Sequence, residues 1–360
     1  MEVLPLNKLD IFSDKETYEL LFNASQNDIA SVVQNAPVII IDKNVFSLYN
    51  SLLNINIEKT ILVDAIEEKK TPEYALSICE SLLAKNITRH DTVVVIGGGI
   101  TQDLVTFATS IVFRGIKWIW LPTTLLAQSD SCIGGKSSLN FKGWKNILGN
   151  FYPPFKIYIQ SYFLNTLSSD DIRSGIGEIL KVHLLSGKEN TEWILTKMKD
   201  YEIDTNILDE MIYSSLRLKN NILEIDPLDQ GLRLKMNYGH SFGHALESAT
   251  NFLIPHGIAV TIGLDMANYI ALKINKLSQY EFDKLHSLLA NNLTDKDFVD
   301  FDFDDFINAL KKDKKNDNMN YKFIIPVSFG EVELTSFPKN ESTEALLREY
   351  ISKYYLLDRK

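Results

Sequence analysis

Residues 237–257 read NYGHSFGHALESATNFLIPHG, and the rest of the chain is organised around this stretch. It contains His240, His244 and His256, three of the six histidines. The first two are four residues apart, so on a helix they share one face. His256 stands at a Pro-His-Gly corner, where we expect a helix to stop and the chain to turn. Two imidazoles on a helix and a third on a returning loop can bind one divalent metal if a carboxylate joins them. Ordinary packing is the alternative.

The length and the charge of the chain limit its possible folds and partners. A chain of 360 residues is too long for one compact core and predicts two domains. Its 45% apolar and 23% charged residues are ordinary for a globular protein. A net charge of −10 argues against nucleic-acid or anionic-membrane partners. A small anionic substrate remains possible if it meets a locally basic pocket.

Cysteine usage and the N-terminus indicate the compartment. The two cysteines, Cys79 and Cys132, belong to no CxxC motif, which excludes zinc-finger and disulfide-framework readings. The first residues do not resemble a signal peptide, and no apolar run is long enough to span a membrane. We therefore expect a reducing, cytoplasmic setting.

The first part of the chain alternates short apolar runs with helical patterns. We expect strands at 37–42, 61–64, 91–96 and 118–122, and a helix at 72–85 that begins with proline. This alternation predicts a parallel sheet with helices on its faces.

After about Leu164 the periods become mainly helical. Helices are expected between 168 and 289, a late strand at 321–326 and a closing helix at 344–355, whereas the acidic stretch 295–305 reads as a solvated surface. We therefore predict an α/β domain over 1–165 and a mainly helical domain over 166–360. A cleft between two such domains is the natural ligand site.

A candidate phosphate-binding turn follows the third expected strand. Gly97, Gly98 and Gly99 precede a helix that contains Asp103, so free backbone N–H groups can approach an anion. The GxGxxG fingerprint is absent, and a plain tight turn explains three glycines as well. Asp42, at the end of the first expected strand, suits a ribose hydroxyl or a helix cap.

Hydroxyl, amide and basic side chains gather between residues 122 and 146. The run PTTLLAQSD (122–130) is followed by Gly134-Gly135-Lys136 and then by Lys145-Asn146. A lysine beside an amide donor suits a phosphate. With Arg114, this region supplies the basic pocket that the overall charge does not.

The missing carboxylate is offered by Glu178. It lies three residues before Lys181 on an apolar helical pattern, and a buried carboxylate needs a partner such as a metal. Arg233 and Asn237 precede the histidines at intervals of four and three. If that stretch is one helix, all four residues lie near one stripe suited to an anionic, hydroxylated substrate. A solvated polar face is the alternative.

Together these motifs resemble the 3-dehydroquinate synthases and, more broadly, the sugar phosphate cyclases. The resemblance covers roughly residues 42–330. It rests on GGG (97–99) with Asp103, RG (114–115), PTTLLAQ (122–128), DS (130–131), GGK (134–136), KN (145–146) with Gly149, Glu178 with Lys181, GHSFGHALE (239–247) and HG (256–257).

The resemblance implies a Rossmann-like NAD-binding α/β domain, a C-terminal mainly α-helical metal-binding domain, and a homodimer. The cofactors it implies are NAD and Zn²⁺ or Co²⁺, with Glu178, His240 and His256 as metal ligands. The matching NAD contacts are Asp42, Glu67, Lys70, Gly97, Gly98, Gly99, Asp103, Thr123, Thr124, Lys145, Phe163, Thr166 and Leu167. The matching substrate and catalytic positions are Asp130, Lys136, Asn146, Lys181, Lys219, Arg233, Asn237, His244, Arg114 (reaching the neighbouring subunit) and Lys314 or Lys315.

The implied reaction closes a carbocycle from a heptulosonate 7-phosphate, as in the shikimate pathway. A hydroxyl held by the metal is oxidised with NAD⁺ as hydride acceptor, phosphate is eliminated, the ketone is reduced again, and an aldol step closes the ring. Lys136, Asn146 and the late lysine are implied to hold the phosphate. Arg233 and Lys219 are implied to hold the carboxylate, with Arg233 suited to a bidentate grip.

Three positions depart from the resembled pattern. Gln102 stands where the family usually has glycine, Ile258 where it commonly has glutamate, and Asp229 where glutamate is usual. The change at Ile258 removes an expected polar partner beside His256. These departures concern the identity of the substrate more than the type of reaction.

Three other functions stay open from the sequence. One is a related cyclase acting on sedoheptulose 7-phosphate or glucose 6-phosphate. The second is a metal-dependent polyol dehydrogenase, which the phosphate-binding set argues against. The third is a non-enzymatic sugar-phosphate sensor, which an intact Glu178, His240 and His256 argue against.

Overall fold

The computed structural model describes residues 7–14, 17–142, 144–199, 205–229 and 231–355. The chain divides into two units. Unit 1 comprises Met1–Leu167 with Lys219–Leu228, and unit 2 comprises Ser168–Leu218 with Asp229–Lys360. The boundary passes inside helix α7 (Thr205–Ile225), whose last residues belong to unit 1.

Unit 1 is built on a seven-stranded sheet of order β1-β2-β9-β6-β5-β3-β4. Its strands are β1 (Asn7–Ile11), β2 (Tyr18–Phe22), β3 (Ile39–Asp42), β4 (Thr60–Val63), β5 (Thr92–Gly97), β6 (Lys117–Pro122) and β9 (Lys156–Ile159). Only β1 and β2 pair antiparallel. The sequence therefore predicted a parallel sheet correctly, with β3 to β6 within two residues of their expected bounds.

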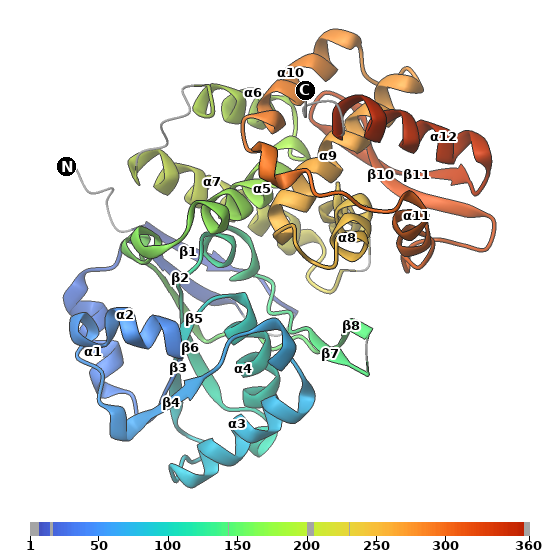
Figure 1. Cartoon of the computed structure of the whole chain (residues 1–360). Coiled ribbons are helices and arrows are strands. Elements are labelled where there is room, and N and C mark those ends of the chain that lie inside the picture. The colour runs from blue at the N-terminus through green and yellow to red at the C-terminus, as the bar shows by residue number, and fades with distance from the viewer. Residues whose placement is uncertain (1–6, 15–16, 143, 200–204, 230, 356–360) are drawn as a thin grey trace. The chain divides into compact units, whose positions relative to one another are not determined.

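Helices cover both faces of this sheet. Figure 1 shows α1 (Gln26–Asn35) and α2 (Lys43–Leu53) on one side, and α3 (Pro72–Ala84) and α4 (Gly99–Ile111) on the other. Ile39 and Ile41 of β3 pack in the core beneath α1 and α2. A sheet covered on both faces needs continuous apolar strands, which is the pattern that β3 and β5 show.

Several strands of unit 1 were not predicted from the sequence. Strands β1, β2 and β9 carry charged side chains, among which Glu19 of β2 pairs with Lys8 and Lys156. The hairpin of β7 (Leu139–Phe141) and β8 (Trp144–Leu148) was not predicted either, and every described residue of β8 is exposed. A strand such as β8, which has no buried face, leaves no apolar alternation to detect.

Unit 2 is mainly helical. Its elements are α5 (Ser169–Leu184), α6 (Lys188–Lys197), most of α7, α8 (His240–Ala249), α9 (His256–Lys273), α10 (Gln279–Ala290), α11 (Phe303–Lys311), the hairpin of β10 (Asn320–Ser328) and β11 (Glu331–Pro338), and α12 (Glu341–Tyr350). The late strand was predicted and its partner β11 was not. Every residue of α9 from Gly257 to Ala271 is buried, and α5, α8, α10 and β10 surround it. A helix that is apolar all round belongs at the centre.

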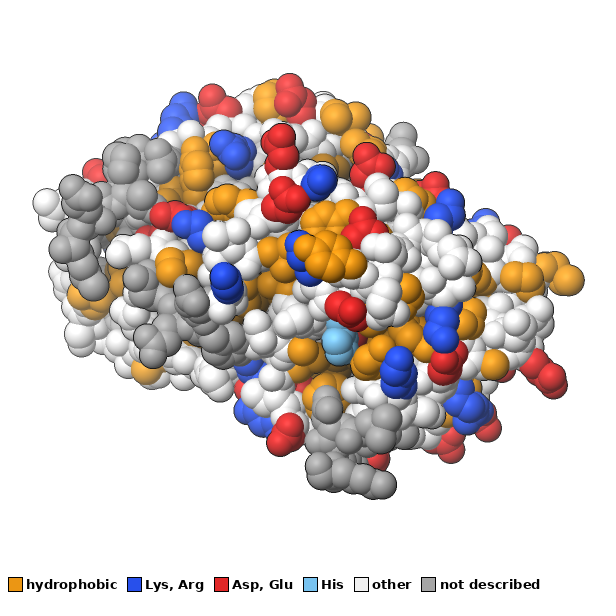
Figure 2. All heavy atoms as spheres, turned by 90° about the horizontal axis from the view of Figure 1, so that it is seen from above, with side chains coloured by type: hydrophobic (Ala, Val, Ile, Leu, Met, Phe, Trp, Pro, Cys, Tyr) orange, Lys and Arg blue, Asp and Glu red, His pale blue; other side chains and the backbone are white. Residues whose placement is uncertain are grey.

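Surface charge is dispersed on the face shown in Figure 2. Acidic, basic and apolar side chains are interspersed there among the described residues. No helix within the described part of the chain is both long and apolar enough to cross a membrane.

Candidate functional site

Three helices of unit 2 bring one carboxylate and two imidazoles together. Glu178 on α5 places its Oε1 3.1 Å from Nε2 of His256 on α9 and 3.5 Å from Nε2 of His240 on α8. His244, one turn after His240, brings its ring centroid within 5.6 Å of that of His256. The candidate ligand atoms of the three histidines all lie within 4.8 Å of one another.

These separations fit a metal ion. Ligand atoms about 2.0–2.1 Å from a tetrahedral zinc lie about 3.4 Å from one another. The two distances from Glu178 fall on either side of that value. Glu178 is only 1% exposed, and a buried carboxylate is stabilised by cationic partners. The donor set of one carboxylate and two imidazoles therefore suits Zn²⁺ or Co²⁺.

The outward nitrogens of both imidazoles are also bonded. His240 donates from Nδ1 to the carbonyl of Tyr238 at 3.3 Å, and His256 donates from Nδ1 to Glu247 at 3.2 Å. Such partners fix the ring orientation and direct each Nε2 towards Glu178, where a cation would bind. Glu247 thus gives His256 a carboxylate partner, although Ile258 itself offers none.

Electrostatics reinforce the cluster. Burial disfavours the charged form of Glu178, but Lys181 and the two histidines outweigh it and hold the pKa of that carboxyl well below its usual value. Burial likewise opposes a charge on His256, while hydrogen bonds to Glu178 and Glu247 raise its pKa to about 10. An imidazole flanked by two carboxylates is a strong base, and the same field favours a metal cation.

Close backbone contact between α5 and α9 places these ligands. A Cβ on Gly257 would lie 1.7 Å from the carbonyl oxygen of Ser174, and one on Gly177 would lie 2.0 Å from that of Gly257. The free N–H of Gly257 donates to Ser174 Oγ at 2.9 Å. Glycine at both crossing positions is therefore what lets Glu178 reach His256.

Two local expectations are wrong. The stretch from Arg233 to His244 is not one helix: Leu232–Asn237 form a 3₁₀ helix, and Gly239, with φ of 78°, interrupts the chain before α8 begins at His240. The expected single stripe therefore does not form, although His240 and His244 do share a face of α8. His256 does not lie on a loop either, because it is the first residue of α9 after Pro255.

The remaining predicted residues of unit 2 fall into two groups. Lys181 forms a buried ion pair with Glu178, and Arg233 is 5% exposed. Asn237 donates to the carbonyl of Leu234 at 3.1 Å. Lys314 is exposed, whereas Lys315 is held by Asp313 at 2.7 Å and acts electrostatically on His244. Lys315 is thus the lysine of this pair whose charge acts on His244.

The glycine turn in unit 1 has the form of an anion site. Gly97 ends β5, Gly98 caps α4 and Gly99 begins that helix. A Cβ on Gly97 would meet Thr101 Oγ1 at 2.4 Å, and one on Gly98 would meet Thr124 Cγ2 at 2.8 Å. Thr123 is bound to this turn through its N–H, which donates to the Gly97 carbonyl at 3.2 Å. Free N–H groups at such a helix N-terminus suit a pyrophosphate.

A charged cluster lies in the same unit. Lys70 Nζ lies 3.2 Å from Asp103 Oδ2 and donates to Asn146 Oδ1 at 2.7 Å, while Lys145 lies 3.3 Å from Glu67. Burial raises the pKa of Asp103 to about 6, against the opposing effect of Lys70. Four predicted NAD contacts are therefore neighbours, and Asn146, predicted to hold phosphate beside Lys136, is joined to them.

The other predicted NAD contacts have structural partners. Asp42 caps α2 by accepting from the N–H groups of Asn44 and Val45. Phe163 is 1% exposed and packs in the core of unit 1. Thr166 bonds to Tyr49 at 2.9 Å, and Leu167 is the last residue of the first segment of unit 1.

The predicted substrate loop follows a π-helical turn, Ala127–Ser131. Asp130 Oδ1 lies 2.7 Å from Lys219, whose ammonium also donates to the Asp130 carbonyl at 2.6 Å. Lys136 is exposed near the Phe151 ring. Arg114 is exposed and has φ of 65°, directly after Phe113 with φ of 51°. Two consecutive non-glycine residues in this region are strained, as is common at functional sites.

Sequence reasoning overlooked several of these partners. Glu247 lies seven residues after His240 on the same helix face, and that spacing was an available signal. Asn140, which donates to Glu67 Oε1 at 3.0 Å, gave no local signal, whereas Gln102, which contacts the substrate loop, was noted only as a departure from the resembled pattern.

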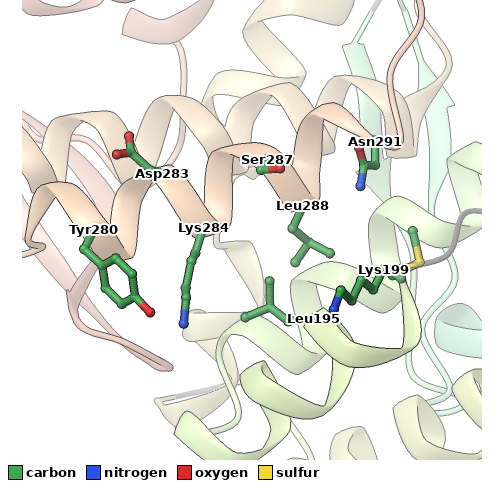
Figure 3. Close-up of a pocket in the computed structure, with 9 residues that line it drawn as sticks. Leu195, Lys199, Tyr280, Asp283, Lys284, Ser287, Leu288 and Asn291 are labelled. Atoms are coloured by element: carbon green, nitrogen blue, oxygen red, sulfur yellow. The ribbon is translucent and has the colours of Figure 1, made fainter.

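A separate pocket of about 450 Å³ lies between α6 and α10 (Figure 3). Its described lining includes Leu195, Lys199, Tyr280, Lys284 and Leu288, and none of the predicted site residues.

Comparisons with known proteins agree with the geometry. The family model described as 3-dehydroquinate synthase N-terminal matches residues 60–174, and the C-terminal model matches 175–316. A 3-dehydroquinate synthase from Thermoanaerobacter sp. (strain X514) is 34% identical over 316 residues, covering 86% of this chain and 89% of the relative. One from Helicobacter pylori (strain HPAG1) is 34% identical over 294 residues, covering 81% and 84%.

Solved structures share the fold. A 2-deoxy-scyllo-inosose synthase complexed with carbaglucose-6-phosphate, NAD⁺ and Co²⁺ has a TM-score of 0.83 at 24% identity, covering 96% of this chain and 99% of that one. A 2-epi-5-epi-valiolone synthase from Streptomyces hygroscopicus with NAD⁺ and Zn²⁺ has a TM-score of 0.81 at 22% identity, covering 95% and 98%. An iron-containing alcohol dehydrogenase is more distant, with a TM-score of 0.61. From the family models and the curated relatives, the chain belongs to the 3-dehydroquinate synthase family.

Proposed function

We propose that this protein catalyses the 3-dehydroquinate synthase reaction, a cyclising elimination of phosphate from a heptulosonate 7-phosphate. The observation that carries the proposal is the convergence of Glu178, His240 and His256 at the separations that one metal ion requires. The shikimate pathway, which leads to aromatic amino acids, is the setting this reaction implies. A cytoplasmic setting belongs to the same proposal and is supported by two free, buried cysteines.

Each unit contributes one cofactor site. In unit 2 the three ligands would hold Zn²⁺ or Co²⁺, and in unit 1 the glycine turn with Asp103, Thr123 and Thr124 would hold NAD. When bound, the metal lowers the pKa of a coordinated hydroxyl, and NAD provides reversible hydride transfer. The residues of the protein orient the metal and NAD and keep other molecules from binding to them.

The phosphate would be held by cations that already have defined positions. Lys315 is fixed by Asp313 next to His244, and His244 is exposed on α8, where it can relay a proton to a leaving phosphate. Lys136 is the exposed cation of the loop in unit 1. Asn146 is bound to Lys70, so we assign it to the cofactor side of the reaction and Lys136 to the phosphate.

Recognition of the substrate carboxylate is assigned mainly to Arg233. Its guanidinium is buried, and a planar guanidinium grips a carboxylate through two parallel hydrogen bonds. Lys219, also predicted to hold the carboxylate, is paired with Asp130. Retention of a buried arginine favours a heptulosonate over a neutral sugar phosphate.

A homodimer is part of the proposal. Arg114 is exposed beside Ile111 and Phe113, which are 43% and 47% exposed. Exposed apolar side chains around a strained arginine suit a contact with a second copy.

Arg114→Ala is expected to retain cofactor binding and lose turnover. Mixing it with a second inactive variant, Glu178→Gln, is expected to restore part of the activity if Arg114 acts in the neighbouring subunit.

The decisive experiment is a substrate panel. The protein is incubated with NAD⁺, Co²⁺ or Zn²⁺ and one of four compounds: a heptulosonate 7-phosphate, sedoheptulose 7-phosphate, glucose 6-phosphate or glycerol. Phosphate release, carbocyclic product and NADH absorbance are recorded. We expect phosphate and carbocycle from the heptulosonate alone, without accumulation of NADH.

The other outcomes identify the alternatives. Equal turnover of a neutral sugar phosphate would point to a different cyclase. Stoichiometric NADH from glycerol would point to a polyol dehydrogenase, a chemistry that alcohol dehydrogenases of this fold make worth testing. Bound metal without turnover of any compound would point to a sensor.

A further inference from the structure

Gln102 joins helix α4 to the loop that carries Asp130 and Lys136. Its Nε2 donates to the carbonyl of Ser131 at 3.0 Å and to the carbonyl of Lys136 at 3.4 Å, and its Oε1 accepts from Ser131 Oγ at 2.8 Å. The side chain is 4% exposed. Both the N–H and the C=O ends of this buried amide therefore bond to one loop. Leaving either end without a hydrogen bond would be costly, because the side chain is buried.

The opposite side of the loop is attached independently. Lys136 forms an isolated bridge with Phe151, Ser137 N–H donates to the Asn150 carbonyl at 2.9 Å, and Tyr152 N–H donates to the Gly135 carbonyl at 2.7 Å. Gly135 has φ of 63°, so the loop turns through a conformation that ordinary residues avoid. Gln102 holds the first and last residues of the segment Ser131–Lys136 from the helix side, across that turn.

Two neighbouring residues on α4 contact different partners. Asp103 pairs with Lys70 in the charged cluster, whereas the side chain of Gln102, one residue earlier, bonds to Ser131 and Lys136 of the loop. Successive residues on a helix point in directions about 100° apart, so one turn can serve both. Helix α4 therefore both holds this loop through Gln102 and forms the glycine turn at its N-terminus.

We propose that Gln102 is a positioning residue that fixes the segment Ser131–Lys136 and so sets the affinity for the phosphate of the substrate through Lys136. The inference rests on the proposed function for the identity of the ligand, but not for the attachment of the loop. Gln102 touches no reacting group. Its contribution is to present the Lys136 ammonium in one place, which reduces the ordering required when an anion binds.

The test compares three variants by amide hydrogen exchange and by kinetics. Gln102→Met keeps the side-chain volume and removes all three hydrogen bonds. Ser131→Ala removes only the bond to Oε1. Thr109→Val, on the same helix, removes a buried side-chain bond to the Val105 carbonyl and does not touch the loop.

We expect Gln102→Met to accelerate exchange of the amides of residues 132–137 in the protein without substrate. The KM for the sugar phosphate should rise about tenfold, with a smaller change in kcat and in NAD affinity. Ser131→Ala should lie between Gln102→Met and the parent, and the double variant should equal Gln102→Met. Thr109→Val should leave both the loop exchange and KM at parent values.

Unchanged exchange at 132–137 in Gln102→Met would overturn the inference. So would faster exchange combined with an unchanged KM, or an equal loss of NAD and substrate affinity, since that pattern indicates general loosening of α4. If the parent protein turns over no sugar phosphate, the proposed function fails. Inorganic phosphate binding would then replace KM as the second readout.

Discussion

Glu247 shows how one side chain beyond the ligand set can decide the strength of a metal site. It accepts from Nδ1 of His256 at 3.2 Å, which directs Nε2 towards Glu178. Loss of such a partner typically lowers metal affinity about 10- to 100-fold. We expect that loss for Glu247→Ala in a zinc titration against a competing chelator.

A matched control is available on the surface of the same unit. Glu192 on α6 is exposed and pairs only weakly with Lys188, at 3.8 Å. Glu192→Ala removes the same charge, and its zinc affinity should stay at the parent value. Equal affinities for both variants would rule out a role for Glu247 at the metal site.

His183 on α5 predicts a pH dependence of stability. It is fully buried, donates from Nδ1 to the Ile179 carbonyl at 2.8 Å and stacks on Trp193. Burial lowers its pKa to about 4, against an ordinary value of 6.5. Between these values the unfolded chain binds more protons than the folded one. The stabilisation is therefore complete above pH 6.5 and is lost as the pH falls towards 4.

The size of this effect follows from the shift in pKa. At about 1.4 kcal/mol per pKa unit, up to about 3 kcal/mol is lost across the window. Denaturant unfolding of the parent and of His183→Gln at pH 7.0, 5.5 and 4.5 measures it, and the difference between the two proteins should shrink with falling pH. Asp103, whose pKa is raised, titrates with the opposite sign in both proteins and cancels in this difference. A difference that does not vary with pH would contradict the assignment.

At the scale of elements, the crossing of α5 and α9 is the critical contact of unit 2. A Cβ at Gly257 would fall 1.7 Å from a backbone oxygen of α5, and a backbone atom cannot rotate away. Gly257→Ala must therefore push the two helices apart. We expect it to lower the free energy of unfolding by about 1–3 kcal/mol.

The same displacement separates Glu178 from His256, so zinc affinity should fall with stability. Ser174→Ala is the companion variant, because it removes the hydrogen bond to Gly257 N–H without adding an atom. Its cost should be about 1 kcal/mol, with little change in zinc affinity. If Gly257→Ala kept both stability and zinc affinity, the close contact would not be what positions the ligands.

For the whole molecule, the two proposed cofactors should stabilise different units. Glu178, His240 and His256 all belong to unit 2, whereas the glycine turn and its partners belong to unit 1. A ligand present at 1,000 times its Kd stabilises its host by about 4 kcal/mol. Hydrogen exchange should therefore show that Zn²⁺ protects α5, α8 and α9, and that NAD protects the N-terminus of α4. Removal of the metal by a chelator should reverse only the first effect. Protection of α5 by NAD alone would contradict this division.

The sequence by itself determined the parallel sheet of unit 1, the helical character of unit 2 and the chemical types of the candidate site residues. Strand and helix periods and the glycine turn are properties of neighbouring residues, so they can be read locally. Tertiary structure alone decided that α8 begins only at His240, that the charge of Lys315 acts on His244, and that Glu247 supports His256. It also decided that Glu178 meets the stretch 237–257 at all. That meeting depends on two helices packing at glycine contacts, and close packing between distant segments leaves no periodic trace in the chain.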